Sequence, residues 1–300
     1  MELSWEDPKV VYTAFVAVAL LVGVGVAALA RMGAAWVPLR TWLFILPPLM
    51  AAVWLGAGVW TVFVAAVSMY GFKEYAKASG LYRERAFVVV VLAAIAGINL
   101  AAFVQRYDFF MAASMWAVLA LVIVPVVLNR TELMLQWLAL SIVGVTLYAF
   151  FLSHLSWLYQ SPLGLGYLLY VLVATALNDV LAFIFGKSLG RHHWTRLSPN
   201  KTVEGSILAL LITIVLAFVQ APFAFPHVPP WGVLLAGVII GVGGQMGDLM
   251  MALLKRNIGI KDWGHLLPGH GGLSDRLNSY MITAPVFAHV MGFLFGGFPA

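Results

Sequence analysis

The chain has 300 residues and a formal net charge of +5; 63% of its residues are hydrophobic and 10% are charged. This composition excludes a soluble domain, because so apolar a surface is incompatible with water, and it indicates a polytopic membrane protein. The absence of cysteine excludes disulfides, thiolate metal sites and cysteine nucleophiles. The positive charge is expected in loops beside the membrane, so no nucleic-acid partner is expected.

Apolar segments recur along the chain, and ten of them are predicted to be membrane helices. Their ranges are 10–30, 41–56, 58–75, 86–104, 108–128, 133–152, 163–185, 206–223, 231–254 and 280–297. The second and third are short and nearly contiguous, so they are predicted to form a helical hairpin bent at Pro47 and Pro48. The expected fold class is therefore all-α, with N-terminal transmembrane helices in residues 1–160 and a catalytic transmembrane region in residues 161–300.

Basic residues divide unequally between the two sides of these segments. Fifteen of the 17 Lys and Arg residues follow odd-numbered segments, and only Lys9 and Arg106 lie on the other side. Cytoplasmic loops carry such an excess. We therefore expect a multi-pass protein of the cell (inner) membrane, with a polar catalytic cavity and its loops facing the cytoplasm and both termini outside. The residues before the first segment are acidic, so no cleavable signal peptide is expected.

Charged residues concentrate in one stretch, GDLMMALLKRNIGIKDWGHLLPGHGGLSDRLNS, from Gly247 to Ser279. If the preceding helix continues through this stretch to Arg256, Asp248 lies about 10 Å deeper in the membrane than Lys255. A carboxylate at that depth is costly unless it is paired or binds a cation. The run from Pro268 to Gly272 is able to turn tightly and bring N–H groups close to an anion. Carboxylates, basic side chains and such a turn together predict a site for a metal-bound polyphosphate.

A second polar stretch, NDVLAFIFGKSLGRHHWTRLSPNKTVEGS, follows the seventh apolar segment. Asp179 precedes Lys187 by eight residues, which places it about 12 Å below the interface, close to the depth of Asp248. We therefore predict that Asp179 and Asp248 approach the same cavity. The SPNKTVEG segment within this stretch has two interpretations that spacing alone leaves open: a phosphate site, or a helix start capped by Ser198 or Thr202 with Glu204 in the first turn.

Both stretches resemble the phosphatidate cytidylyltransferase (CDP-diacylglycerol synthase) family, in the KR, KD, LPGHGG and DR elements between Lys255 and Arg276 and in SPNKTVEG. The N-terminal half matches only in being hydrophobic, apart from a weak FKEY element at Phe72 to Tyr75. The chain departs from the family pattern at Met251, Ala252 and Asn278, where Glu, Ser and Asp are usual.

The resemblance implies CTP and an anionic lipid phosphate, with phosphatidate the first choice, as substrates, and a CDP-lipid and pyrophosphate as products. The expected roles are metal ligation by Asp248 and Asp275; catalysis by Asp262, Lys255, Arg256 and Lys261; and substrate binding by Ser198, Lys201, Thr202, Glu204, His270, Gly271, Gly272, Arg276 and Asp179. Mg²⁺ is the expected cofactor, with a second, monovalent cation left open. Membrane lipids are expected partners, and a homodimer is left open.

Three alternatives remain. A CTP-dependent polyprenol or phytol kinase would transfer the γ-phosphoryl group to an alcohol instead. An ion or solute transporter would explain intramembrane carboxylates without chemistry. A catalytically impaired paralogue is consistent with the three departures.

Outside the site, Gly237 and Gly241 are expected to allow close helix packing, and His289 to form an interhelical hydrogen bond.

Overall fold

The computed structural model describes residues 7–17, 33–161, 164–267 and 271–296, which are helical apart from short loops and two isolated β-bridges. Residues 8–17 form a first helical segment. The other elements are α2 (Gly33–Trp54), α3 (Ala57–Ala78), η1 (Leu81–Arg83), α4 (Arg85–Phe103), α5 (Tyr107–Leu128), α6 (Met134–Gly144), the π-helix η2 (Val145–Phe151), α7 (Leu152–Gln160), α8 (Leu165–Leu189), α9 (Val203–Ala224), α10 (Pro230–Asn257), α11 (Ser274–Leu277) and α12 (Tyr280–Phe295). The expected all-α class is confirmed.

Within the described residues, seven helices are long and apolar enough to cross a membrane. They are Arg85–Phe103, Tyr107–Leu128, Met134–Gln160, Leu165–Leu189, Val203–Ala224, Pro230–Asn257 and Ser274–Phe295. The protein is therefore a multi-pass membrane protein, although ten spans exceed what these helices support. The first predicted segment lies mostly outside the described residues. The second and third correspond to α2 and α3, which join at Gly56, a glycine with φ of 104°.

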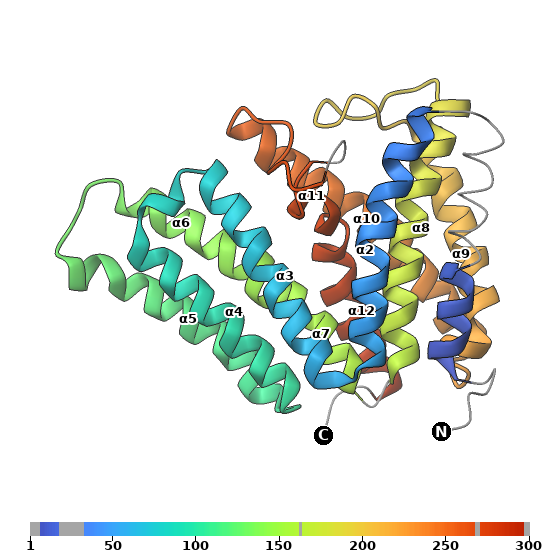
Figure 1. Cartoon of the computed structure of the whole chain (residues 1–300), viewed down its shortest axis with the longest axis horizontal. Helices are drawn as coiled ribbons and strands as arrows, with labels where there is room; N and C mark the ends of the chain where they lie inside the picture. Colours follow the sequence, from blue (N-terminus) through green and yellow to red (C-terminus); the bar gives the residue numbers. More distant parts are fainter. Residues whose placement is uncertain (1–6, 18–32, 162–163, 268–270, 297–300) are drawn as a thin grey trace.

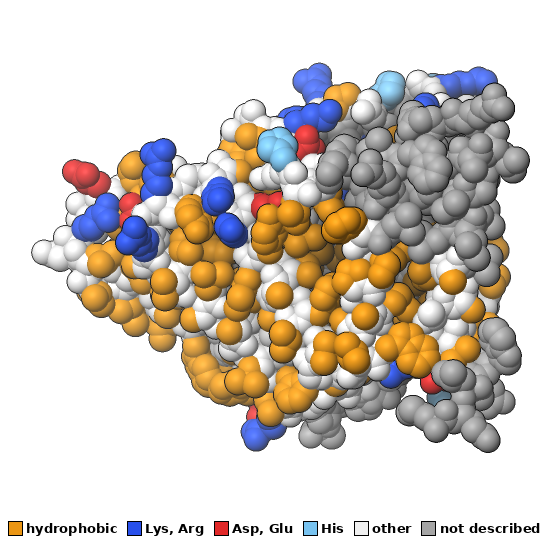
Figure 2. Space-filling view, in the orientation of Figure 1, with side chains coloured by type: hydrophobic (Ala, Val, Ile, Leu, Met, Phe, Trp, Pro, Cys, Tyr) orange, Lys and Arg blue, Asp and Glu red, His pale blue; other side chains and the backbone are white. Residues whose placement is uncertain are grey.

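The helices form two groups (Figure 1). Helix α3 packs against α4 and α7, and α4 against α5, while α9 contacts both α8 and α10, and α10 contacts α12. Helix α7 joins the groups through its contacts with α8 and α12. The polar loops after α8 and α10 lie at one end of the helices, and in Figure 2 the charged side chains gather mainly along that edge, above a broad apolar surface.

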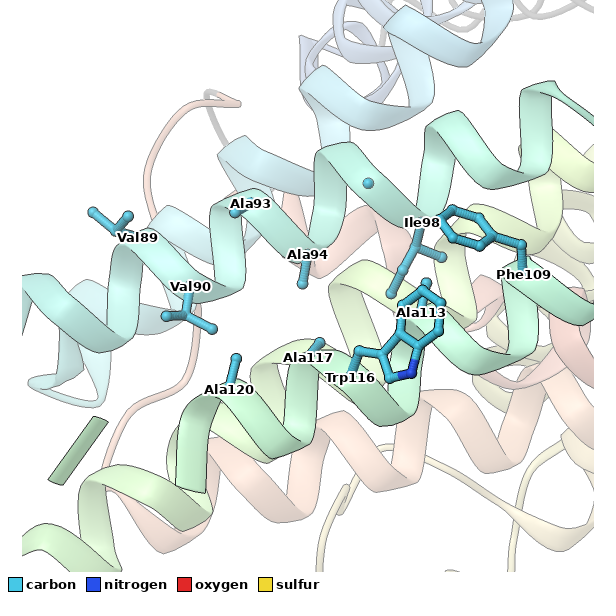
Figure 3. A pocket seen from close by; sticks show the side chains of 11 residues that line it. Val89, Val90, Ala93, Ala94, Ile98, Phe109, Ala113, Trp116, Ala117 and Ala120 are labelled. Atoms are coloured by element: carbon cyan, nitrogen blue, oxygen red, sulfur yellow. The ribbon is translucent and has the colours of Figure 1, made fainter. Parts of the chain in front are cut away.

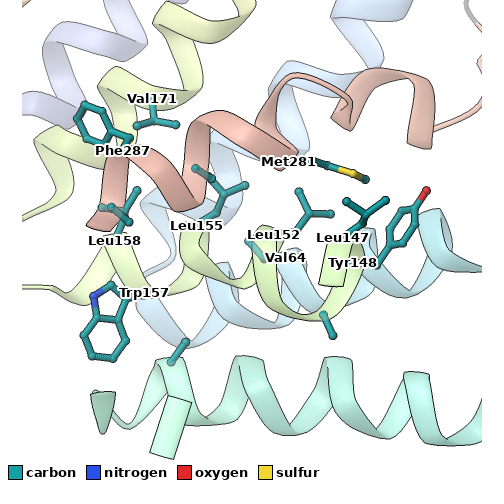
Figure 4. Close-up of a cluster of buried hydrophobic side chains, with 14 of the residues drawn as sticks. Val64, Leu147, Tyr148, Leu152, Leu155, Trp157, Leu158, Val171, Met281 and Phe287 are labelled. Carbon is teal, nitrogen blue, oxygen red and sulfur yellow. The ribbon is translucent and has the colours of Figure 1, made fainter. Parts of the chain in front are cut away.

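The junction between the two groups is packed with large apolar side chains (Figure 4). Leu155 of α7 and Val64 of α3 meet Phe287 of α12 in one buried cluster. Trp60 of α3 adds a hydrogen bond, with its indole N–H donating to the Leu155 carbonyl at 2.9 Å. This junction fixes α12, whose first residues carry part of the site described below.

Glycines let α9 and α10 approach closely, as predicted. A Cβ atom built on Gly237 would lie 2.8 Å from Ile214 Cα, and one on Gly241 would lie 3.2 Å from Leu210 Cα. No side chain larger than hydrogen fits at such separations, so the two backbones pack directly on each other. Helix α10, which carries Asp248, is held by this contact.

An apolar groove of about 350 Å³ lies between α4 and α5 (Figure 3). It is lined by small and aromatic residues, among them Ala94, Ala113 and Trp116. No charged side chain lines it, and neither helix carries a residue predicted for the site. The groove therefore does not coincide with the polar site.

Candidate active site

Two carboxylates meet at the hydroxyl of Ser279. Asp179 comes from α8 and Asp248 from α10, while Ser279 directly precedes α12. The Ser279 Oγ lies 2.9 and 2.8 Å from the two carboxylate oxygens of Asp179, and 3.3 Å from Asp248 Oδ1. Asp179 and Asp248 thus approach each other, as their matched depths predict, and α8, α10 and the residue before α12 contribute to one partly buried polar cluster.

Close backbone packing makes this cluster possible. A Cβ atom on Gly247 would lie 2.9 Å from Ser279 Cα and 2.4 Å from the Asn278 carbonyl oxygen. On the same helix, a Cβ on Gly244 would lie 2.9 Å from Asn178 Nδ2. A larger side chain at Gly247 would push the backbone of Asn278 and Ser279 away from α10, and one at Gly244 would displace the Asn178 side chain.

Lys201 brings the loop between α8 and α9 into the cluster. Its Nζ lies 3.0 Å from Asp248 Oδ2, and the two side chains are only 17% and 29% exposed. The same ammonium lies 3.5 Å from the Gln245 carbonyl oxygen. Lys201 and Arg276 both interact electrostatically with Asp179. Residues from both sequence motifs therefore converge on one site.

The loop that carries Lys201 is fixed by its neighbours. Thr202 caps α9, since its side chain accepts a hydrogen bond from the Gly205 N–H at 3.2 Å, so the helix-cap interpretation is confirmed for Thr202. Glu204 accepts hydrogen bonds from the backbone N–H groups of Arg191 and His192 at 3.0 and 3.2 Å and also contacts the His192 ring. The Ser198 carbonyl accepts from the Lys201 N–H, which closes the turn. In this structure Thr202 and Glu204 hold the loop, and Lys201 reaches the site.

Asp275 belongs to a neighbouring cluster. Its Oδ1 lies 2.6 Å from Lys255 Nζ, and its Oδ2 accepts hydrogen bonds from the Trp263 and Gly272 N–H groups, both at 2.9 Å. Lys255 follows Asp248 by seven residues, about 10 Å along α10. Among the described contacts none joins Asp248 to Asp275, and Asp248 shares the Ser279 hydroxyl with Asp179. Joint metal ligation by Asp248 and Asp275 stays a prediction.

The glycine-rich turn binds anions, but those anions are carboxylates of the protein. The Gly272 N–H donates to Asp275. The Leu273 and Ser274 N–H groups donate to the two oxygens of Glu74 in α3, at 3.1 and 2.8 Å. Gly271 has φ of 77°, a left-handed conformation that favours glycine. The Gly272 N–H therefore already has an acceptor within the protein, and the expected contact of Gly272 with phosphate stays a prediction. His270 lies outside the described residues.

The remaining predicted residues lie on the exposed side of this loop. Arg256, Lys261, Asp262 and Arg276 are all exposed. The Arg256 guanidinium donates to the Ile260 carbonyl at 3.2 Å. A Cβ atom on Gly271 would lie 3.3 Å from Asp262 Oδ1, so Asp262 flanks the turn. These side chains surround the buried clusters with charge.

Sequence analysis did not single out Ser279 or Glu74 as site residues. Both are buried, at 1% and 7% exposure. The available signals were weak: Ser279 lies three residues after Arg276 of the DR element and directly follows the unusual Asn278, and Glu74 is the acidic residue of FKEY. Contacts such as Glu74 to Ser274 span 200 residues, and local spacing carries no information about them.

The donor set at Ser279 fits a divalent cation. Mg²⁺ binds oxygen, commonly through one or two carboxylates, and completes its coordination with water and substrate phosphates. In the described part of the chain, no three His, Asp or Glu side chains form a group that could hold a metal ion. The pair formed by Asp179 and Asp248, with the Ser279 hydroxyl between them, nevertheless offers the two carboxylates that such a cation uses when a phosphate ligand supplies the rest.

Comparisons with known proteins identify the family of the chain. The model of the cytidylyltransferase family matches residues 36–294. A phosphatidate cytidylyltransferase of Staphylococcus haemolyticus is 41% identical over 124 residues, 41% of this chain and 48% of that protein. The uncharacterized protein YnbB of Escherichia coli K12 is 40% identical over 150 residues, 48% of this chain and 50% of that protein. The chain thus spans about half the length of these curated relatives. Because the family model covers most of the chain, the protein belongs to the cytidylyltransferase family.

Proposed function

We propose that the protein transfers the cytidylyl group of CTP to an anionic lipid phosphate, with phosphatidate the first candidate. The observation that carries this proposal is the convergence of Asp179, Asp248 and Lys201 on Ser279, within a chain of the cytidylyltransferase family. The relatives named phosphatidate cytidylyltransferase support the same substrates.

The reaction is an in-line displacement at phosphorus. An oxygen of the lipid phosphate attacks the α-phosphorus of CTP, the bond from that phosphorus to the bridging oxygen of the β-phosphate breaks, and pyrophosphate leaves. The attacking oxygen is already ionised at neutral pH, so no strong general base is required. Catalysis then depends on positioning the two phosphates and offsetting their charge.

Each side chain near Ser279 has a part in this scheme. Asp179 and Asp248 would hold Mg²⁺, which when bound offsets the charge of the triphosphate. The Ser279 hydroxyl keeps the two carboxylates together. Lys201 balances Asp248 and is close enough to contact a phosphate bound there. Lys255, Arg256, Lys261 and Arg276 supply further positive charge at the same end of the helices, where CTP would enter from the cytoplasm and the lipid from the bilayer.

The test is turnover by the purified protein in lipid nanodiscs. With radiolabelled CTP, magnesium and a panel of lipid phosphates, we expect pyrophosphate and a labelled CDP-lipid, and no turnover in EDTA. Asp179→Asn and Asp248→Asn should abolish turnover. Asp108→Asn should not, because Asp108 has an 80% exposed side chain in a surface ion pair with Arg106.

Other products would refute the proposal. Release of CDP with a phosphorylated alcohol would identify a lipid kinase. Ion flux in proteoliposomes without any CTP turnover would identify a transporter.

A further inference from the structure

Glu74 is a buried carboxylate without a basic partner in the described part of the chain. It lies in the last two turns of α3 and is 7% exposed. None of the described ion pairs includes it; its hydrogen bonds come from the N–H groups of Leu273 and Ser274. A buried carboxylate needs compensation, and here two backbone amides from the far end of the chain supply it.

Two glycines of the C-terminal motif are packed directly on this carboxylate. A Cβ atom on Gly264 would lie 2.4 Å from Glu74 Oε1, and one on Gly272 would lie 2.6 Å from Oε2. A Cβ atom at either glycine would displace the Glu74 carboxylate, and one on Gly272 would also lie 2.7 Å from the Gly264 backbone nitrogen. The glycines in DWGH and HGG therefore let the turn close onto Glu74.

A second contact ties the same turn to the N-terminal half. The Ser274 hydroxyl donates to the Gly71 carbonyl at 2.9 Å, one helical turn before Glu74. Tyr148 of η2 lies 3.0 Å from the same hydroxyl oxygen. The turn is therefore held by α3 and η2 together, and all of these contacts are buried or nearly so.

The turn leads directly to the site. Ser274 begins α11, and Ser279, which contacts Asp179 and Asp248, follows five residues later. Asp275 in the same short helix binds Lys255 and the Trp263 N–H. A displacement of the turn at Glu74 would therefore move Ser279 and the Lys255 cluster together.

We infer that Glu74 is a positioning residue for cytidylyl transfer: it fixes the Gly271–Ser274 turn, and through that turn it sets the position of Ser279 between the two carboxylates. The inference rests on the proposed function, because a misplaced Ser279 is detected as a change in kcat/KM for CTP and in the magnesium concentration needed for turnover. Glu74 acts through Leu273 and Ser274 and contacts no substrate group in this scheme.

The first test is steady-state kinetics of Glu74→Gln. The amide replaces one accepting oxygen with a donor that faces a backbone N–H, so one charge-assisted hydrogen bond is lost. We expect kcat/KM for CTP to fall about tenfold or more, and the half-saturating magnesium concentration to rise. Glu74→Asp keeps the charge but shortens the side chain, and should recover part of the loss.

The matched control is Tyr75→Phe. Tyr75 is the next residue of α3, it is 2% exposed, and its hydroxyl donates to the Leu140 carbonyl at 3.0 Å. Loss of this hydroxyl should lower the unfolding temperature of the protein without changing how CTP turnover depends on magnesium. Equal changes in magnesium dependence for both variants, or wild-type kinetics for Glu74→Gln, would overturn the inference.

A second measurement does not depend on activity. The chain has no cysteine, so Tyr82→Cys and Leu266→Cys would introduce the only two thiols for spin labels. These side chains are 45% and 48% exposed, after α3 and in the loop before the turn. We expect Glu74→Gln to shift or broaden the distance distribution between the labels, and Tyr75→Phe to leave it unchanged.

The two measurements separate the two proposals. If the wild-type protein turns over no CTP, the proposed function fails and the label distances alone decide whether Glu74 holds the turn. If CTP turns over and Glu74→Gln leaves the distances unchanged, the positioning role is wrong while the proposed function stands.

Discussion

Ser279→Ala removes one oxygen atom at the point where the two carboxylates meet. The hydroxyl lies 2.8 and 2.9 Å from the oxygens of Asp179 and 3.3 Å from Asp248 Oδ1, and the residue is 1% exposed. A hydrogen bond to a charged group contributes about 1.5–3 kcal/mol, which corresponds to about ten- to a hundredfold in rate. We therefore expect kcat/KM for CTP to fall by that factor, and the half-saturating magnesium concentration to rise, because the carboxylates lose their common donor.

The assay is pyrophosphate release at several magnesium concentrations, with Thr283→Val as the control. Thr283 lies one turn further along α12, donates to the Ser279 carbonyl at 3.0 Å and accepts from Thr175 at 3.2 Å. It is as buried as Ser279 but contacts neither carboxylate. Thr283→Val should reduce the unfolding temperature while keeping the magnesium dependence of the wild type. If Ser279→Ala turns over CTP with wild-type kcat/KM at limiting magnesium, the shared carboxylate site is not where the reaction occurs.

Three further changes test other parts of the site, and a fourth, Gly97→Ala, is the control for one of them. Lys201→Met removes the ammonium 3.0 Å from Asp248, so turnover should fall about tenfold or more as two neighbouring carboxylates lose their counter-charge; wild-type turnover would exclude Lys201. Gly247→Ala should lower stability by about 1–3 kcal/mol and reduce turnover, because its Cβ would lie 2.4 Å from the Asn278 carbonyl. Gly97→Ala, where a Cβ meets nothing within 4 Å, should be neutral or stabilising in the same thermal unfolding assay. Asn278→Asp should lower the magnesium concentration needed for half-maximal turnover; an unchanged value would make Asn278 peripheral.

Local regularity made part of the site predictable. Helix rise converts residue spacing into depth, and it placed Asp179 and Asp248 at matching levels before any contact was known. Because α8 and α10 pack against each other, the two side chains at these matching levels come together. Glycine spacing predicted the close packing at Gly237 and Gly241, whereas the helix start was predicted only as far as a cap at Ser198 or Thr202.

Contacts between distant parts of the chain could not be predicted in this way. The pairing of Asp275 with Lys255 depends on how the loop after α10 folds back on itself. The turn at Gly271 has the backbone expected for anion binding, yet its amides bind Asp275 and Glu74. The glycine spacing predicted that the backbone N–H groups of this turn bind an anion. It did not predict that the anion would be a carboxylate of the protein itself.

The carboxylates described above each have an internal counterpart: an ammonium for Asp248 and for Asp275, backbone amides for Glu74, and a hydroxyl for Asp179. Acidic groups left uncompensated among membrane helices would oppose insertion. Because each of these four has a polar partner within the chain, insertion of the bundle need not await nucleotide or metal. An empty enzyme should therefore reach the bilayer fully assembled, and its ligands would exchange with partners that the chain itself provides.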